Sequence, residues 1–133
     1  MYILLDTNVL LWTAGASARL DQATTDLIEN PSNNVMFSAA SIWEIAIKTG
    51  LGRPDFQIAP EFIIQAAQQS GFVELPITAQ TAAKAVDLPP HHKDPFDRLL
   101  IVQAMSEPAI FLTTDRILTR YTDLVTLVGR QPS

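Results

Sequence analysis

Four acidic residues, far apart in the chain, fall at positions that a sheet edge can bring together. Asp6 directly follows the short apolar run of residues 2–5, and Asp115 follows a later apolar run after two threonines. Glu44 and Asp97 fall in the first two turns of two predicted helices, each beginning where a polar residue ends a strand or loop. In open α/β sheets, ligands bind beyond the carboxyl ends of the strands, where the following helices begin. We therefore expect these four acids to converge on one cleft.

Clustered carboxylates favour a particular chemistry. Two such charges about 4 Å apart repel by about 4 kcal/mol at an effective dielectric constant of 20, so the cluster needs protons or a cation. The chain has no cysteine and only two histidines, both in one loop, which leaves mainly carboxylate oxygens as ligands. Oxygen ligands suit Mg²⁺ or Mn²⁺ better than Zn²⁺. Such ions bind phosphate oxygens and activate water, so phosphodiester hydrolysis is the expected reaction class.

The helix that carries Glu44 is apolar apart from one narrow stripe. Ser41, Glu44 and Lys48 form that stripe, within roughly 60° of one another around the helix axis. The spacing of Ser41 and Glu44 matches a capping box, but the helix is expected to begin before Ser41, which excludes this role. An ion pair of Glu44 with Lys48 remains an alternative. A helix that is apolar on most sides is expected to be buried on most sides.

The other three acids also have structural alternatives. Asp6 begins Asp-Thr-Asn, which is ordinary turn chemistry at the end of a strand. Asp97 would interact favourably with the dipole of its helix, although Asp94 already provides the N-cap. Asp115 is a candidate cap for a short helix. Each acid alone is weak evidence for a metal site. The stronger observation is that all four are expected at the same edge of the sheet.

Short apolar runs alternate with helical patterns along the whole chain, which predicts an α/β fold with a mostly parallel sheet. Ser38 is a predicted N-cap, Asp94-Pro95 a predicted cap and first helical residue, and Pro60 a predicted helix start. The expected strands are residues 2–5, 35–37, 72–75, 109–112 and 124–128. The expected helices begin near residues 9, 21, 39, 60, 78 and 95.

Length and composition limit the remaining possibilities. A chain of 133 residues predicts a single domain, 1–133, and 47% hydrophobic residues exclude a disordered chain. The absence of cysteine excludes disulfides, and no signal peptide or membrane span is visible, so we expect a cytoplasmic protein. The net charge of −5 argues against a basic patch for nucleic acid. Setting aside the four acids leaves −1, however, so an RNA substrate is not contradicted.

Four motifs in one order resemble the PIN-domain ribonucleases, specifically the VapC-type toxins of type II toxin–antitoxin systems. They are Asp6-Thr7-Asn8, residues 41–45 (SIWEI), residues 92–100 (HKDPFDRLL) and Thr113-Thr114-Asp115. The resemblance implies a PIN-like three-layer fold and a Mg²⁺- or Mn²⁺-dependent endoribonuclease, often dimeric and inhibited by a cognate antitoxin. It assigns Asp6 and Asp97 as the principal metal ligands. Glu44 and Asp115 would hold the metal directly or through water.

Residues beside these acids have weaker assignments. Asn8, Thr113 and Thr114 are candidates for orienting carboxylates, although turn and strand-end roles are favoured. Arg98 is interpreted as either a phosphate ligand or a member of a surface ion pair. The pair His91-His92 is expected to be solvated.

Three other classes of protein compete with a nuclease. Haloacid-dehalogenase-type phosphatases need an aspartate where this chain has Asn8, and receiver-like modules need a lysine that the segment after Asp115 lacks. The remaining alternative is a catalytically silent protein whose acidic cleft binds a basic partner segment. Charged residues make up only 17% of the chain, which is consistent with a partner-covered surface and predicts a homodimer. Asp6→Asn is expected to preserve the fold and abolish cleavage.

Overall fold

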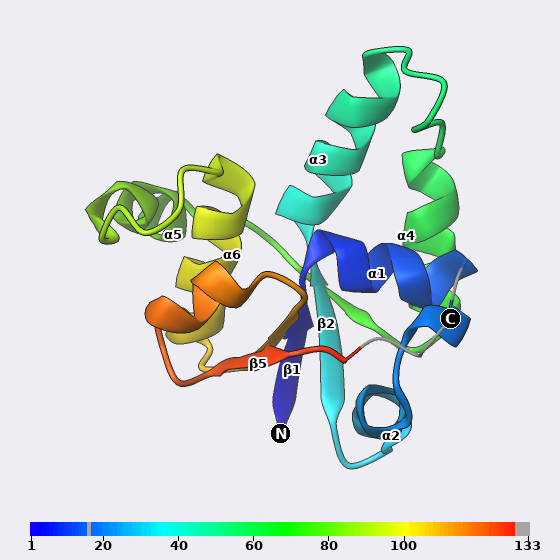
Figure 1. The fold of residues 1–133 in the computed structure, drawn as a ribbon, viewed down its shortest axis with the longest axis horizontal. Helices are drawn as coiled ribbons and strands as arrows, with labels where there is room; N and C mark the ends of the chain where they lie inside the picture. Colours follow the sequence, from blue (N-terminus) through cyan, green and yellow to red (C-terminus); the bar gives the residue numbers. More distant parts are fainter. Residues whose placement is uncertain (16, 130–133) are drawn as a thin grey trace.

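A computed structural model describes residues 1–15 and 17–129, and its central feature is a parallel sheet of five strands (Figure 1). The strand order is β3-β2-β1-β4-β5, and every neighbouring pair is parallel. The strands are β1 (Tyr2–Leu5), β2 (Asn34–Ser38), β3 (Val73–Leu75), β4 (Ile110–Thr113) and β5 (Val125–Leu127). The α-helices are α1 (Thr7–Gly15), α2 (Gln22–Glu29), α3 (Ala39–Gly50), α4 (Pro60–Gln69), α5 (Ala79–Lys84) and α6 (Pro95–Ser106). Three short 3₁₀ helices are η1 (Ser17–Arg19), η2 (Ala85–Asp87) and η3 (Arg116–Arg120).

The central strands are buried on both faces because their apolar residues run without interruption. Ile3 and Leu5 of β1 pack into one hydrophobic cluster, whereas Leu4 between them packs into another. The same alternation holds in β2, where Phe37 joins the first cluster and Met36 the second. Parallel sheets covered on both faces read as near-continuous apolar runs, as these strands do.

Helices on either side of the sheet complete three layers. The first cluster includes residues of α1 and α4, and residues of α2 pack against it. The second cluster includes residues of α6 and η3. The predicted PIN-like arrangement, with a mostly parallel sheet between helices, is confirmed. No helix of the described residues is long and apolar enough to cross a membrane.

Predicted helix starts are observed where capping chemistry placed them. The Ser38 hydroxyl accepts a hydrogen bond from the Ala40 N–H at the start of α3. Asp94 caps α6 and Pro95 is its first residue, while Pro60 begins α4. Side-chain acceptors at helix starts satisfy N–H groups that the helix itself leaves without partners.

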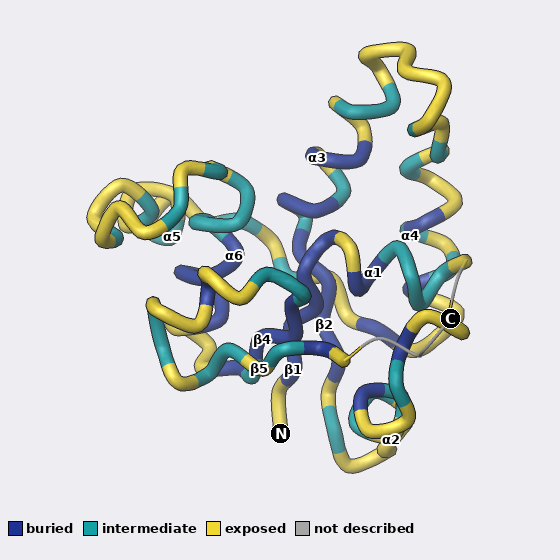
Figure 2. Tube along the Cα trace, in the orientation of Figure 1, coloured by how far each residue is buried: buried dark blue, intermediate teal, exposed yellow. Residues whose placement is uncertain are grey.

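The prediction that the apolar helix α3 is buried on most sides is wrong. Ala40, Ser41, Glu44 and Ile45 are buried, but the Trp43 side chain is 60% exposed and Ile47 is 40% exposed. Figure 2 shows buried and exposed segments alternating along this helix. The helix starts at the sheet and continues beyond its carboxyl edge beside α4, so the sheet covers only its first turns (Figure 1).

Candidate metal centre

The four predicted acids line one cavity at the carboxyl edge of the sheet. Its volume is about 150 Å³, and its lining combines residues from the ends of β1 and β4 with residues from α1, α3 and α6. Besides Asp6, Glu44, Asp97 and Asp115, the described residues that line it are Thr7, Asn8, Lys48, Asp94 and Thr114. The structure therefore brings together acids that lie as far as 109 positions apart in the sequence.

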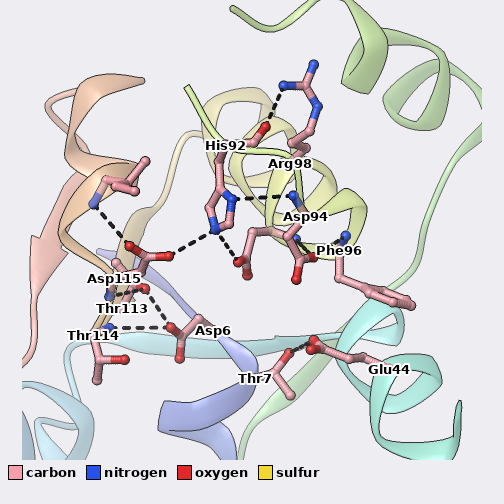
Figure 3. A network of polar contacts seen from close by, with 12 residues as sticks. Asp6, Thr7, Glu44, His92, Asp94, Phe96, Arg98, Thr113, Thr114 and Asp115 are labelled. Carbon is pink, nitrogen blue, oxygen red and sulfur yellow. Dashed lines mark hydrogen bonds and ion pairs between the residues drawn. The ribbon is translucent and has the colours of Figure 1, made fainter. Parts of the chain in front are cut away.

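Asp6 is the most enclosed of the four acids and has two roles. Its Oδ1 accepts the Val9 N–H at 2.7 Å, which caps α1, so the turn alternative for this residue is also correct. Its Oδ2 accepts the Thr113 hydroxyl at 2.6 Å and the Thr114 N–H at 3.4 Å (Figure 3). Burial raises the pKa of Asp6, these hydrogen bonds offset part of the rise, and the charge of Glu44 adds to it.

Glu44 faces the cavity from the first half of α3, and both of its oxygens have partners. The Thr7 hydroxyl donates to Oε1 at 2.7 Å, and Lys48 pairs with Oε2 at 2.8 Å. Thr7 also bonds to the Ser41 hydroxyl at 3.0 Å, which joins α1 to α3. The ion pair proposed as an alternative is thus present within the acidic site. Sequence reasoning missed Thr7, although its position beside Asp6 was the available signal.

Asp97 lies one turn into α6 and contributes a carboxylate that has no capping duty. Asp94 caps the helix by accepting the Phe96 and Asp97 N–H groups at 2.8 and 3.1 Å. The Asp97 carboxylate is partly buried and lies 3.1 Å from Nε2 of His92. Burial, with the negative charges of Asp94, Asp6 and Glu44, raises the pKa of Asp97 from 3.8 to about 7, against a smaller lowering by His92.

Asp115 follows β4 and is the most exposed of the four acids, with 37% of its side chain accessible. Its Oδ1 accepts the Ile117 N–H at 3.1 Å, which confirms the predicted cap of a short helix. Its backbone N–H donates to the Thr113 hydroxyl at 3.1 Å (Figure 3). Thr113 therefore contacts both Asp6 and Asp115, a role beyond that of a strand-end residue.

The prediction of a solvated histidine pair is wrong for one of its members. His92 places Nε2 at 2.9 Å from Asp115 and 3.1 Å from Asp97, whereas His91 is exposed and meets the Tyr121 ring edge-on. The two side chains therefore lie in different surroundings, and His92 is the one that faces the acids. No period in the sequence of this loop indicates which of the two histidines faces the site.

Arg98 forms no ion pair with a described residue, so the ion-pair interpretation is wrong. Its guanidinium donates to the carbonyl oxygens of Ala85, Leu88, Pro89 and His92 at 2.8–3.2 Å, and to the Tyr121 hydroxyl at 3.4 Å. Five donors arranged in a rigid fork make arginine well suited to bind several carbonyls of one loop. Arg98 thus fixes the loop before α6, and none of its hydrogen bonds to described residues reaches the acids.

The donor set of this cavity fits a hard divalent cation. Five carboxylates line it, those of Asp94 and the four predicted acids, and Lys48 alone is basic among the described lining residues. Burial is the main cause of the raised pKa values of Asp6 and Asp97, and the negative charges of neighbouring carboxylates add to both. A bound divalent cation supplies the missing positive charge, and carboxylate oxygens match Mg²⁺ or Mn²⁺.

A larger cavity of about 510 Å³ lies elsewhere on the molecule. Thr13, Thr25, Glu29 and Phe72 are among its lining residues, and none of the four predicted acids belongs to it. Size alone would favour this cavity. We place the functional site in the smaller cavity because six ionisable residues line it, whereas Glu29 is the one acidic or basic residue among the described residues that line the larger cavity.

Thr113 offers a test of how far hydrogen bonds to the acids support the site. Thr113→Val keeps the shape of the side chain but removes its hydrogen bonds to Asp6 and from Asp115. We expect a loss of about 1–3 kcal/mol in the free energy of unfolding, because buried polar groups lose a partner. Affinity for Mn²⁺ should fall by about 10–100-fold. Calorimetric titration and thermal melts measure both, and Thr126→Val, at an exposed strand position, is the matched control.

Comparison with known proteins places the chain in a family. A model of the PIN domain matches residues 3–124. This chain belongs to the PIN-domain family, as its four motifs predicted. No curated protein matches the chain in sequence.

Solved structures share the fold at low sequence identity. VapBC2 from Rickettsia felis, solved with a fragment of promoter DNA, gives a TM-score of 0.70 at 14% identity, covering 96% of this chain and 98% of that chain. DNA-bound VapBC from Salmonella typhimurium gives 0.67 at 17% identity, with coverage of 96% and 98%. VapBC-1 from nontypeable Haemophilus influenzae gives 0.63 at 15% identity, with coverage of 97% and 98%.

Proposed function

We propose that this protein is a Mg²⁺- or Mn²⁺-dependent endoribonuclease that acts as the toxin of a toxin–antitoxin pair. The observation that carries the proposal is the meeting of Asp6, Glu44, Asp97 and Asp115 in one cavity of a PIN-domain protein. Residues 1–133 form a single PIN domain in this proposal. The similarity in fold to VapBC proteins supports the choice of a toxin within the family.

Each acid has a distinct part in the proposed site. Asp6 and Asp97 are the principal ligands, while Glu44, oriented by Thr7 and Lys48, holds the cation directly or through water. When bound, the cation supplies positive charge to the scissile phosphate and lowers the pKa of a coordinated water. Asp115 completes the ligand set directly or through water, and its carboxylate, the most exposed of the four, is also the candidate to take a proton from water.

If the protein is a toxin, it has an antitoxin as its protein partner. A toxin is held inactive by a cognate antitoxin, and the named structural neighbours are VapBC proteins. Trp43 and Ile47 of α3 are exposed apolar residues close to Glu44, which is consistent with a partner-covered surface. A cytoplasmic homodimer is part of the proposal.

The second candidate function is that of a catalytically silent acidic cleft. The excess of carboxylates over basic groups in the cavity favours a basic partner segment as well as a metal. The two functions differ in their need for a divalent cation, because a peptide-binding cleft requires none.

The purified, antitoxin-free protein should cut RNA only in the presence of a suitable metal. We expect total cellular RNA to yield discrete fragments with Mg²⁺ or Mn²⁺ and none with a chelator, because the acids then lack the charge that binds phosphate. Gel electrophoresis of the treated RNA measures the cleavage, and DNA of matched length tests whether the protein prefers RNA. Equal cleavage with chelator would overturn the metal assignment. No cleavage with either metal, from protein shown to be folded by circular dichroism, would favour the acidic-cleft function.

A further inference from the structure

His92 connects two acids that come from different parts of the fold. Its Nε2 lies 3.1 Å from Oδ2 of Asp97 in α6 and 2.9 Å from Oδ2 of Asp115, which follows β4. Among the described residues, no other side chain contacts both carboxylates through a hydrogen bond or ion pair. The imidazole is 22% exposed, so it occupies a sheltered place at the edge of the cavity (Figure 3).

Spacing alone would make His92 a metal ligand. One ligand atom from each of His92, Asp97 and Asp115 lies within 4.8 Å of the others. Neighbouring ligands of an octahedral ion with bonds of about 2.1 Å are about 3.0 Å apart, which resembles the separations around Nε2. A hydrogen bond has the same length, however, so distance does not decide between the two roles.

The other ring nitrogen decides between them. Nδ1 accepts the Asp94 N–H at 3.3 Å, so it carries a lone pair rather than a proton (Figure 3). A neutral imidazole has one ring proton, which must then be on Nε2, facing the two carboxylates. Histidines that bind metals show the opposite arrangement, in which the second nitrogen donates its N–H to a carboxylate or carbonyl. Here that second nitrogen faces a donor.

The surrounding loop holds His92 in this orientation. The Tyr121 hydroxyl accepts the His92 backbone N–H at 2.9 Å and donates to the Pro89 carbonyl at 2.9 Å. Arg98 donates to the carbonyl of His92 at 3.2 Å and to three more carbonyls of the same segment. The loop is thus tied to α6 through Arg98 and to the residue that follows η3, Tyr121.

The geometry points to His92 as a positioning residue that donates its Nε2–H to Asp97 and Asp115, rather than as a ligand of the metal. The donor keeps the two carboxylates close enough to bind one cation together. The expected effect of His92 on metal affinity rests on the proposed function, whereas the position of the proton on the His92 ring does not. The inference also gives a role to Arg98 and Tyr121, which support the loop without touching the acids.

The proton position can be observed directly in the wild-type protein. Long-range ¹H–¹⁵N spectra of ¹⁵N-histidine-labelled protein, recorded at alkaline pH where imidazole is neutral, distinguish protonated from unprotonated ring nitrogens. A His91→Gln variant assigns the two residues. We expect the His92 proton on Nε2 in the metal-free protein and still on Nε2 at saturating Mg²⁺. A proton on Nδ1 in the metal-free protein, or loss of the Nε2 proton as Mg²⁺ binds, would overturn the inference.

A pair of variants separates donor from ligand by affinity. His92→Gln keeps an N–H donor, whereas His92→Leu fills the space without a donor. His91→Leu is the control because His92, and not His91, pairs with Asp97 and Asp115. We expect His92→Leu to weaken binding of Mg²⁺ and of Mn²⁺ equally, by about 10–100-fold in calorimetric titrations. His92→Gln should stay within a few-fold of wild type. A selective loss of Mn²⁺ in both variants would instead identify His92 as a nitrogen ligand.

Failure of the inference is distinguishable from failure of the proposed function. If wild-type protein binds neither cation, the proposed metal site is wrong, and the spectra of the metal-free protein still decide where the His92 proton lies. If wild type binds metal and all His92 variants match it, the positioning role is wrong while the metal site stands. Melting curves of each variant establish that it is folded.

Discussion

Asp97→Asn is expected to abolish metal-dependent RNA cleavage and, at the same time, to stabilise the metal-free protein. Burial and the charges of Asp94, Asp6 and Glu44 raise the pKa of Asp97 from 3.8 to about 7. The folded state therefore binds more protons than the unfolded state between about pH 4 and pH 7, so stability falls as the pH rises through that window. Asparagine cannot ionise, which removes this loss and one proposed ligand together.

The size of the gain follows from the shift in pKa. Each unit corresponds to about 1.4 kcal/mol, so a shift of this size sets an upper limit of about 4 kcal/mol at pH 8. The asparagine side chain retains an oxygen that can accept the His92 N–H, so that contact is preserved. We expect the midpoint of thermal unfolding in chelator to rise by about 5 °C at pH 8. Calorimetric melts at pH 5 and pH 8 measure the gain, which should be less than half as large at pH 5 as at pH 8.

Asp123→Asn is the matched control, because Asp123 is exposed and lies outside the cavity. It should leave both cleavage and the melting midpoint unchanged. Asp6→Asn is the less decisive substitution, since Oδ1 of Asp6 also caps α1 and a loss of activity could follow from a shifted helix. An Asp97→Asn protein that cleaves RNA like wild type would exclude Asp97 as a ligand. One that is less stable than wild type at pH 8 would mean that its carboxylate is not destabilising in the folded state.

Much of the fold could be predicted because local chemistry and tertiary structure agree. The run of residues 2–5 is apolar at every position, as a central parallel strand requires, and Ser38, Asp94 and Pro60 provide unambiguous starts for their helices. Once strands and helices alternate, parallel topology places the end of every strand at one edge of the sheet. The convergence of Asp6 and Asp115 follows from that rule alone.

The contacts around the acids could not be predicted by the same reasoning. His92 lies in a loop with two prolines, where no helical or strand period indicates which way a side chain points. Arg98 binds carbonyl oxygens of a loop whose path depends on Tyr121, 23 residues further along the chain. Trp43 is exposed although Glu44 and Ile45, further along α3, are buried, so its exposure depends on which face of the helix packs against the rest of the fold. The apolar residues all round this helix do not indicate that face.

Affinity for divalent cations is expected to depend steeply on pH below about 7. A cation that binds at Asp97 must displace its proton, since the raised pKa keeps this carboxyl largely protonated in mildly acidic solution. One displaced proton lowers the apparent association constant about tenfold for each pH unit below the pKa, and Asp6, whose pKa is also raised, makes the slope steeper at lower pH. Above about pH 8 the affinity for Mg²⁺ should become constant.

Calorimetric titrations with Mg²⁺ between pH 5.5 and pH 8.5, repeated in buffers of different ionisation enthalpy, give both the slope and the number of protons released. We expect about one proton at pH 6 and almost none at pH 8.5. Saturating Mg²⁺ should also remove the loss of stability expected in chelator between about pH 4 and pH 7, because the cation provides the charge that the clustered carboxylates lack. Affinity that is flat from pH 6 to pH 8 would show that the cation binds away from Asp97. A stability loss that persists with bound Mg²⁺ would separate the two acids with raised pKa values from the metal site.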